Sequence, residues 1–111
     1  MGPSADAYRG TIPSMALDII HRPDASRFEA TIGPRLAICS YRRSGDVLVL
    51  HHTEVPAAMQ GQGLAGELVA AALAWARSSG LQVRPTCSYV AAYMRRHPET
   101  QDLLERPDRV A

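Results

Sequence analysis

The chain has 111 residues, of which 46% are hydrophobic and 21% charged, and its formal net charge is +1. This length predicts a single domain, which buries about 60–70% of the surface of the unfolded chain and can form a core without metals or disulfides. The near-neutral charge, the scattered arginines and the lack of an aromatic stacking platform argue against nucleic acid as a partner.

Cysteine usage and hydropathy indicate a cytoplasmic protein. The two cysteines, Cys39 and Cys87, show no metal-ligand spacing and are expected to be reduced thiols. No apolar run is long enough to span a bilayer, and the N-terminus lacks the basic and apolar regions of a signal peptide. We therefore expect no bound metal and no membrane partner.

The pattern of small and turn-forming residues sets the predicted domain boundaries. Residues 1–14 are rich in Gly, Pro and Ser and show no hydrophobic periodicity, so we predict a tail that is disordered, of vector origin or from an upstream start. Residues 15–106 are predicted to form the domain, and residues 107–111 a second tail.

The first half of the domain has the pattern of an antiparallel meander. Strands are predicted over residues 17–21, 28–32, 36–41 and 47–55. In the second of them, apolar Phe28 and Ala30 alternate with polar Glu29, as in a half-buried strand. Turn residues separate the strands, with Gly33-Pro34 after the second and Ser44-Gly45-Asp46 after the third.

The second half of the domain is predicted to be helix, short strand and helix. Residues 64–79 carry one apolar face, and Gly80 follows as a C-terminal stop. That face consists of Leu64, Leu68, Ala71, Ala72 and Trp75. A strand is expected over residues 81–84, then a helix from an N-cap at Ser88 to about His97, ended by Pro98, and a short turn over residues 99–105. The fold class is therefore α+β with a mixed sheet.

Three glycines lie where the fourth strand passes into the first helix, at Gly61, Gly63 and Gly66. The first amides of a helix have no intrahelical partners, and glycine lets an anion approach the backbone closely. The loop is therefore either a phosphate site or a tight turn without a ligand. It matches neither the nucleotide-triphosphatase loop nor the dinucleotide-binding fingerprint.

The same loop reads Q-x-x-G-x-A over residues 60–65 and resembles the acyl-CoA pyrophosphate loop of the GNAT N-acetyltransferase superfamily. Further motifs, HTEVP at 52–56, PTCSYV at 85–90 and RRHP at 95–98, make the chain similar to the short, single-domain YjdJ-type branch. The resemblance extends from about Asp18 to Leu104. It implies a minimal GNAT acyl-CoA N-acyltransferase fold that binds acetyl-CoA or coenzyme A as a cosubstrate.

The resemblance also implies a set of cofactor-binding residues. The backbone amides expected to hold the pyrophosphate are those of Gln62, Gly63, Leu64, Ala65 and Gly66. Gln60 is expected to line the approach, and Thr53 and Val55 to lie beside the pantetheine arm. Arg96 is either a ligand for a CoA phosphate or part of a solvated helix face.

Acetyl transfer to an amine needs a neutral nucleophile, and removing the proton of a lysine-like amine at pH 7 costs about 4–5 kcal/mol. His52 and Glu54 share a strand face and are the candidate bases, whereas His51 points to the other face unless a bulge intervenes. A structural histidine in the sheet is the alternative for His52.

Two further residues are candidates for the chemistry. Cys87 directly precedes a helix N-terminus, which lowers a thiol pKa, so it is a nucleophile, a base or a small buried residue. Tyr93 has the spacing of the superfamily tyrosine that protonates the CoA thiolate, although the usual Y-x-x-x-G-F pattern is absent. Tyr89 lies one turn earlier, and either tyrosine can instead pack in the core.

The predicted function is an acetyl-CoA-dependent N-acetyltransferase in which the amine attacks the thioester directly. The alternatives are a CoA-binding module with little or no catalysis and a Cys87-dependent acyl-enzyme. The acceptor is a small molecule or a protein, and the chain is a monomer or a homodimer. Because the superfamily's usual helices between the first two strands are missing, a large acceptor, a partner subunit or no reaction is favoured.

Overall fold

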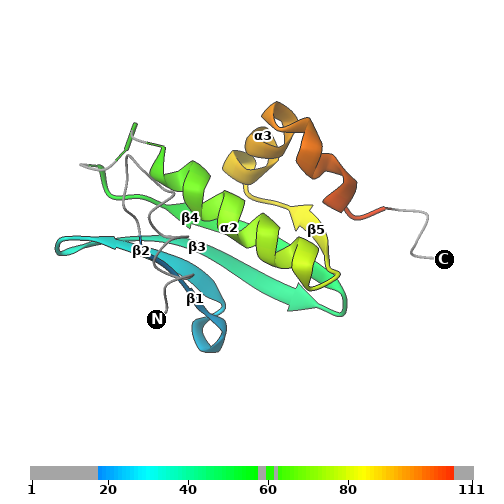
Figure 1. Cartoon of the computed structure of the whole chain (residues 1–111), viewed down its shortest axis with the longest axis horizontal. Coiled ribbons are helices and arrows are strands. Elements are labelled where there is room, and N and C mark those ends of the chain that lie inside the picture. The colour runs from blue at the N-terminus through cyan, green and yellow to red at the C-terminus, as the bar shows by residue number, and fades with distance from the viewer. Residues whose placement is uncertain (1–17, 58–59, 62, 107–111) are drawn as a thin grey trace, which may run out of the picture.

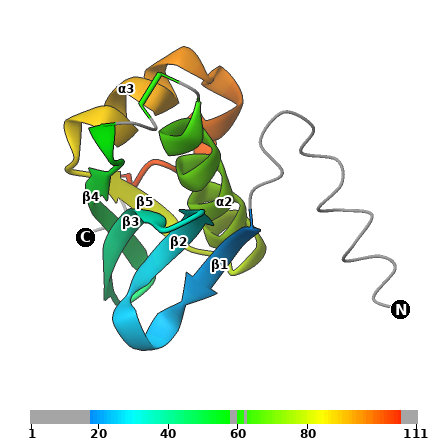
Figure 2. The same cartoon turned by 90° about the vertical axis from the view of Figure 1, so that its left-hand side faces the viewer.

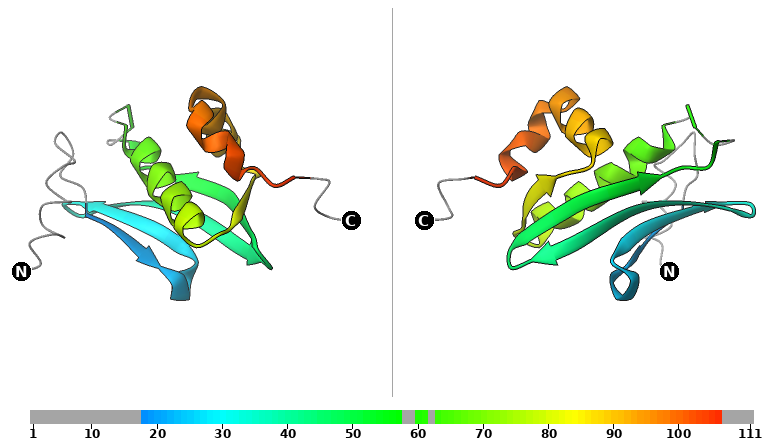
Figure 3. Two further views of the ribbon diagram at one scale, coloured as in Figure 1. Left: turned by 45° about the vertical axis from the view of Figure 1, so that its right-hand side comes forward. Right: turned by 180° about the vertical axis from the view of Figure 1, so that it is seen from behind.

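The computed structural model describes residues 18–57, 60, 61 and 63–106, which form a mixed five-stranded sheet with helices on one face (Figure 1). The predicted α+β class is confirmed. Figures 2 and 3 show α2 across the sheet and α3 beside α2 near the β5 end. The tails predicted at residues 1–14 and 107–111 lie outside the described residues, as does the start of the predicted domain.

The predicted meander is confirmed and forms most of the sheet. Its strands are β1 (Asp18–Arg22), β2 (Arg27–Ile32), β3 (Arg35–Ser44) and β4 (Val47–Glu54), each antiparallel to the next. A single 3-10 turn, η1 (Pro23–Ala25), connects β1 to β2. β3 is longer than predicted because Gly45, at φ +61°, and Asp46 complete the turn into β4 without Ser44.

The rest of the chain adds α2 (Leu64–Ser78), β5 (Gln82–Pro85), α3 (Ser88–Arg96) and the 3-10 helix η3 (Pro98–Leu103). Gly80 ends α2 as predicted, at φ +71°, and the following amide of Leu81 donates to Ala76 O at 2.8 Å. The predicted N-cap Ser88 is wrong by one residue. Cys87 is the N-cap because its amide donates to Leu50 O at 3.0 Å, which holds it extended at ψ 128°.

The hydrophobic core lies between the sheet and the two helices. Leu48 and Leu50 of β4 meet Leu68 of α2 and Val90 of α3, and all four are fully buried. Each such side chain contributes about 1.5–3 kcal/mol through the apolar area that it removes from water. Trp75, predicted on the apolar face of the helix, is half-buried at the margin of the core, with the Arg43 guanidinium 6.0 Å from its ring.

Glu29 was expected on the polar face of β2, yet only 9% of it is exposed. Arg27 Nε lies 2.7 Å and Arg22 Nε 3.2 Å from its carboxylate oxygens. The hydrogen bond from Arg27 lowers the pKa of Glu29 despite the opposing effect of burial. The arginines therefore cover a carboxylate that strand alternation alone places toward solvent.

An aromatic cluster with a histidine at its centre joins β1 to the margin of α2. The His21 ring stacks on Phe28 at 4.2 Å and lies 4.4 Å from the Trp75 ring. His21 Nε2 is 2.7 Å from the Tyr41 hydroxyl. Burial among these rings lowers the pKa of His21, which makes the cluster most stable with a neutral imidazole.

Acidification should therefore weaken the fold through His21. The native pKa is below the unfolded value of about 6.5, so the unfolded chain binds the proton first. The contribution is complete above that value and is lost as the pH falls below it toward the lowered native pKa. In urea melts, the free energy of unfolding should fall more steeply between about pH 7 and pH 5 for the wild type than for His21→Gln. Equal slopes would contradict this role.

Candidate active site

The sheet opens between β4 and β5. Parallel pairing ends at Leu50 and Pro85, where the amides of Thr86 and Cys87 both donate to Leu50 O, at 3.1 and 3.0 Å. The chain then leaves the sheet to enter α3. Residues 51–54 of β4 keep β3 on one side and have no strand of the described ranges on the other. This unpaired edge can pair with an extended ligand in the manner of an added strand.

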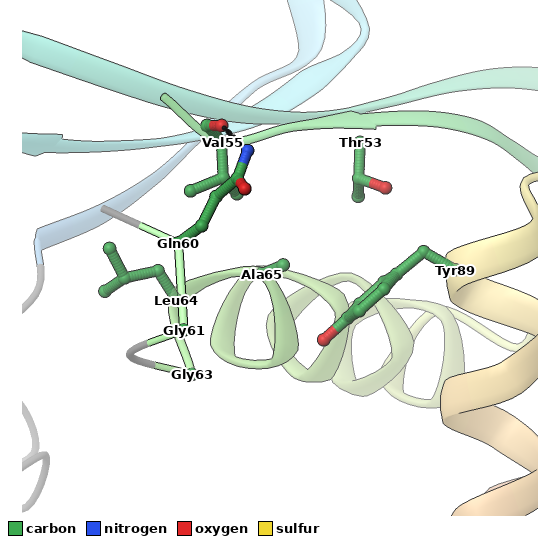
Figure 4. A pocket seen from close by; sticks show the side chains of 8 residues that line it. All are labelled: Thr53, Val55, Gln60, Gly61, Gly63, Leu64, Ala65 and Tyr89. Atoms are coloured by element: carbon green, nitrogen blue, oxygen red, sulfur yellow. Dashed lines mark hydrogen bonds between the residues drawn. The ribbon is translucent and has the colours of Figure 1, made fainter. Parts of the chain in front are cut away.

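A β-bulge at His51 decides which side chains face this opening. Ser40 pairs with His52 and Tyr41 with Leu50, so His51 is the extra residue. Regular alternation from Leu50 would turn His52 toward the helices. The extra residue instead turns Thr53 and Val55 toward α2 (Figure 4).

The bulge also leaves His52 and Glu54 on the open face of the sheet. Their side chains share this face, with His52 Nε2 3.4 Å from Glu54 Oε1. More than half of each side chain is exposed, 54% for His52 and 68% for Glu54. A base and a carboxylate are thus available to solvent on the face opposite Thr53.

A cavity of about 450 Å³ lies between the end of β4, the start of α2 and the start of α3. Its lining residues are Thr53, Val55, Gln60, Gly61, Gly63, Leu64, Ala65 and Tyr89 (Figure 4). Most of the residues expected to bind a cofactor are therefore gathered at one cavity. Gln62 lies outside the described residues.

The glycine loop shapes one wall of this cavity. Gln60 Nε2 donates to Val55 O at 2.9 Å and ties the loop to the end of β4. Gly61 and Gly63 have φ of +82° and +78°. Apart from Gly63 and its chain neighbours, no heavy atom of the described residues lies within 4 Å of the position of a Cβ on Gly63. The first helical bond of α2 runs from the Glu67 amide to Gly63 O, so the preceding amides are free of intrahelical partners. The open space beside these amides fits an anion.

Cys87 lies next to the cavity and contacts one of its lining residues. Its Sγ is 3.2 Å from Thr53 Oγ1. Burial alone would raise the pKa of Cys87, but the Thr53 hydroxyl and the amides of Val90, Tyr89 and Thr53 outweigh burial and lower it. Cys39, in contrast, is fully buried, and desolvation raises its pKa to about 12. The pKa values of the two thiols are thus shifted in opposite directions.

The two tyrosines of α3 have different surroundings. Both reach Gly66 of α2, since the Tyr89 hydroxyl lies 3.5 Å and a ring carbon of Tyr93 3.6 Å from the position of a Cβ on that glycine. Tyr89 also lines the cavity. Tyr93 stacks on His97 at 4.0 Å and lies in a separate hollow with Arg77 and Leu103. Tyr89 thus lines the cavity, whereas Tyr93, one turn further from the N-terminus of α3, lines the other hollow. The role of Tyr93 as proton donor stays a prediction.

Arg96 lies in the last turn of α3, exposed and not among the residues that line the cavity. Contact between Arg96 and an outlying CoA phosphate stays a prediction. The side-chain contact of Thr53 with Cys87 was not foreseen from the sequence. No signal in the sequence identifies the bulge that creates it, beyond the adjacent histidines at its position.

Two further properties concern metal ions and membranes. Within the described ranges, no group of three or more His, Cys, Asp or Glu side chains is placed to hold a metal ion. The described helices also include none with the length and apolar character that a membrane crossing requires.

Comparisons with known proteins bear on the family to which the chain belongs. Residues 27–103 match the family described as GCN5-related N-acetyl-transferase. The chain is 39% identical over 71 residues to mouse Protein NATD1, which covers 63% of the chain and 64% of the mouse protein. The human protein of that name is also 39% identical over 71 residues, which are 62% of its length. The chain thus spans somewhat less than two thirds of these relatives.

Other matches extend further along the chain. Protein NATD1 of Xenopus tropicalis is 32% identical over 97 residues, covering 85% of the chain and 88% of that protein. A solution structure of a GCN5-like candidate N-acetyltransferase from Staphylococcus aureus superimposes with a TM-score of 0.66. It covers 80% of the chain and 88% of its own, at 24% identity, and shows the fold alone. On the family match and these relatives, the chain belongs to the GCN5-related N-acetyl-transferase family.

Proposed function

We propose that the protein is an N-acetyltransferase that uses acetyl-CoA as donor and transfers its acetyl group to an amine. The observation that carries this proposal is the cavity at the start of α2, where two glycines at positive φ leave open space beside the unpaired edge of β4. A diphosphate suits the first of these features and an extended pantetheine arm suits the second. Membership of the family supports acetyl transfer in general.

The proposed cosubstrate site uses the backbone more than the side chains. The amides of Gly63, Leu64, Ala65 and Gly66, together with that of Gln62, are assigned to the pyrophosphate, with the positive end of α2 behind them. Thr53 and Val55 face the pantetheine arm, and Gln60 keeps the loop closed. Arg96 is assigned to a phosphate of CoA that lies outside the cavity.

The two faces of β4 would divide the chemistry between them. The acceptor nitrogen attacks the thioester carbonyl and forms the N–C bond, while His52, oriented by Glu54, takes the proton that the amine loses. The C–S bond breaks, its electron pair leaves with the CoA sulfur, and the Tyr89 hydroxyl supplies the proton of the free thiol. Proton exchange with solvent then restores His52 and Tyr89.

The acceptor is proposed to be large. His52 and Glu54 lie on the face of the sheet opposite the cavity, and β1 and β2 are joined only by the short turn η1. No described helix therefore lies beside His52 and Glu54 to enclose a small amine. An amine carried by a protein or peptide brings its own binding surface and suits this open face better.

A Cys87 acyl-enzyme is the second candidate mechanism, favoured by the lowered pKa of this thiol and its contact with Thr53. In this route the thiolate attacks the acetyl carbonyl, the acetyl group moves to Sγ, and CoA leaves as a thiolate that takes a proton from solvent. An amine then attacks the Cys87 thioester and forms the N–C bond, the C–S bond breaks with its electron pair left on Sγ, and the proton lost by the amine passes to solvent.

Calorimetric titration with acetyl-CoA and with free CoA, followed by intact-mass analysis, tests the proposal. We expect both ligands to bind and the protein mass to stay unchanged. Lack of binding would contradict the function. A mass gain of one acetyl group that is lost in Cys87→Ala would instead establish the acyl-enzyme. Binding without thiol release in the presence of free amines and lysine peptides would indicate a module without catalysis.

The positions of the tyrosines give a matched pair of variants. Tyr89→Phe should slow thiol release from acetyl-CoA about tenfold, because a thiol with a pKa of about 8.5 needs only moderate help to leave. Tyr93→Phe, which removes the same hydroxyl one turn away from the cavity, should leave the rate within about twofold of the wild type. Steady-state thiol release checks both variants, and the reverse order of effects would return the role to Tyr93.

A further inference from the structure

We propose that Thr53 is a positioning residue whose hydroxyl holds the Cys87 sulfur beside the unpaired edge of β4 and keeps it reactive. The bulge at His51 brings the side chains of Thr53 and Cys87 together. The inference rests on the Cys87 acyl-enzyme, the second candidate mechanism above, only for the identity of the electrophile, which is the thioester of acetyl-CoA. Thr53 itself does not react.

Thr53 is the residue that connects the cavity to the thiol. Its side chain lines the cavity, and its Oγ1 lies 3.2 Å from Cys87 Sγ. This contact spans the place where β4 and β5 separate, since Cys87 follows the last pairing at Leu50 and Pro85. The hydroxyl thus holds the sulfur at the opening where an extended thioester would lie.

The bulge explains why a threonine occupies this position. With regular alternation after Leu50, Thr53 would face away from the helices and an imidazole, that of His52, would face Cys87. The extra residue at His51 reverses this order. A short hydroxyl then stands against the sulfur, while the bulkier His52 is placed on the opposite face.

A hydroxyl at this distance acts on the charged form of the sulfur. When Cys87 is a thiolate, Thr53 Oγ1 donates to it and stabilises it, as do the amides at the start of α3. Cys39 shows the result of burial without such donors. It pairs with Thr53 across β3 and β4, is fully buried and has its pKa raised to about 12.

The titratable groups around Cys87 are few and can be separated by experiment. Cys39 approaches from β3 and couples electrostatically with Cys87. Tyr89 follows in α3 and lines the same cavity. His52 and Glu54 belong to β4 but lie on its other face. The hydroxyl of Thr53 is therefore the polar side chain of β4 that faces the sulfur.

Alkylation of the full chain with iodoacetamide from about pH 6 to pH 10, followed by intact-mass analysis, tests the inference. Thr53→Val removes the hydroxyl and keeps the volume, Thr53→Ala removes both, and Thr53→Ser keeps the hydroxyl. We expect the midpoint of the Cys87 profile to rise by about half to one pH unit in the Val and Ala variants, slowing alkylation at neutral pH about three- to tenfold. The Ser variant should retain the wild-type midpoint, and Cys87→Ala should leave only the slow reaction of Cys39.

An unchanged midpoint in Thr53→Val and Thr53→Ala would overturn the inference, as would a Ser variant that behaves like them. Calorimetry with acetyl-CoA on the same samples keeps the two proposals apart. Wild-type protein that fails to bind acetyl-CoA overturns the proposed function and leaves the thiol comparison valid. Wild-type binding together with a profile that does not depend on Thr53 overturns the positioning role alone.

Discussion

Replacing Gly63 with valine is expected to raise the Kd for CoA about 100-fold while the protein stays folded. The Cβ of the new residue would enter the open space beside the first amides of α2. A diphosphate kept from those amides loses at least about two charge-assisted hydrogen bonds of about 1.5 kcal/mol each, which is about 3 kcal/mol and about 100-fold in Kd. Calorimetry with free CoA measures the change directly.

The strain of a β-branched residue at positive φ must be separated from the loss of the anion site. Gly45→Val is a matched control, since Gly45 has φ +61° and lies in the β3–β4 turn. Among the described residues other than its chain neighbours, Gly45 also has no heavy atom within 4 Å of its Cβ position. Both variants should lose about 1–2 kcal/mol of stability from the left-handed backbone. Only Gly63→Val should lose CoA. Equal affinities in the two variants would contradict the pyrophosphate assignment.

Local signals in the sequence predict most of the fold. The alternation around Phe28, the Gly45 turn and the Gly80 stop each depend on near neighbours in the chain, and all three lie where expected. The N-cap of α3 depends instead on a tertiary contact, because the bond from Cys87 to Leu50 O decides where the helix begins. Propensity favours Ser88 at that position, and the backbone of a distant strand overrides it.

The candidate site is predictable only where it depends on local signals in the sequence. The loop is predictable from Gly61 and Gly63, because it needs positive φ values that glycine adopts far more readily than other residues. Tyr89 lines the cavity and Tyr93 does not, although both reach Gly66 of α2, and spacing along one helix does not encode how it packs against another. The contact of Thr53 with Cys87 requires a bulge, and a bulge depends on the register between two strands.

That register gives the site its two sides. Thr53 and the neighbouring thiol face the helices, whereas His52 and Glu54 face the open side of the sheet. A thioester held along the edge of β4 would therefore be accessible to a base from one face and to a proton donor from the other. Such a division keeps the attacking amine and the leaving thiol apart, as a direct transfer requires.

Removing the imidazole of His52 is the strongest test of this division between a base on one face of β4 and a proton donor on the other. His52→Ala should lower the rate of amide formation about 100-fold at saturating acetyl-CoA, because a general base typically contributes about 100-fold or more. The Kd for CoA should stay within about twofold, since His52 lies on the face of β4 opposite the cavity. Thiol release with a panel of lysine peptides and free amines measures the rate.

The adjacent histidine supplies the control. His51→Ala removes the same imidazole from the bulged position, also exposed but without the contact to Glu54, and should retain at least about half of the wild-type rate. Glu54→Gln should lie between the two, at about a tenfold loss, because a contact of 3.4 Å orients His52 without holding it tightly. Equal losses in His51→Ala and His52→Ala would mean that the bulge, and not the base, is what the reaction needs.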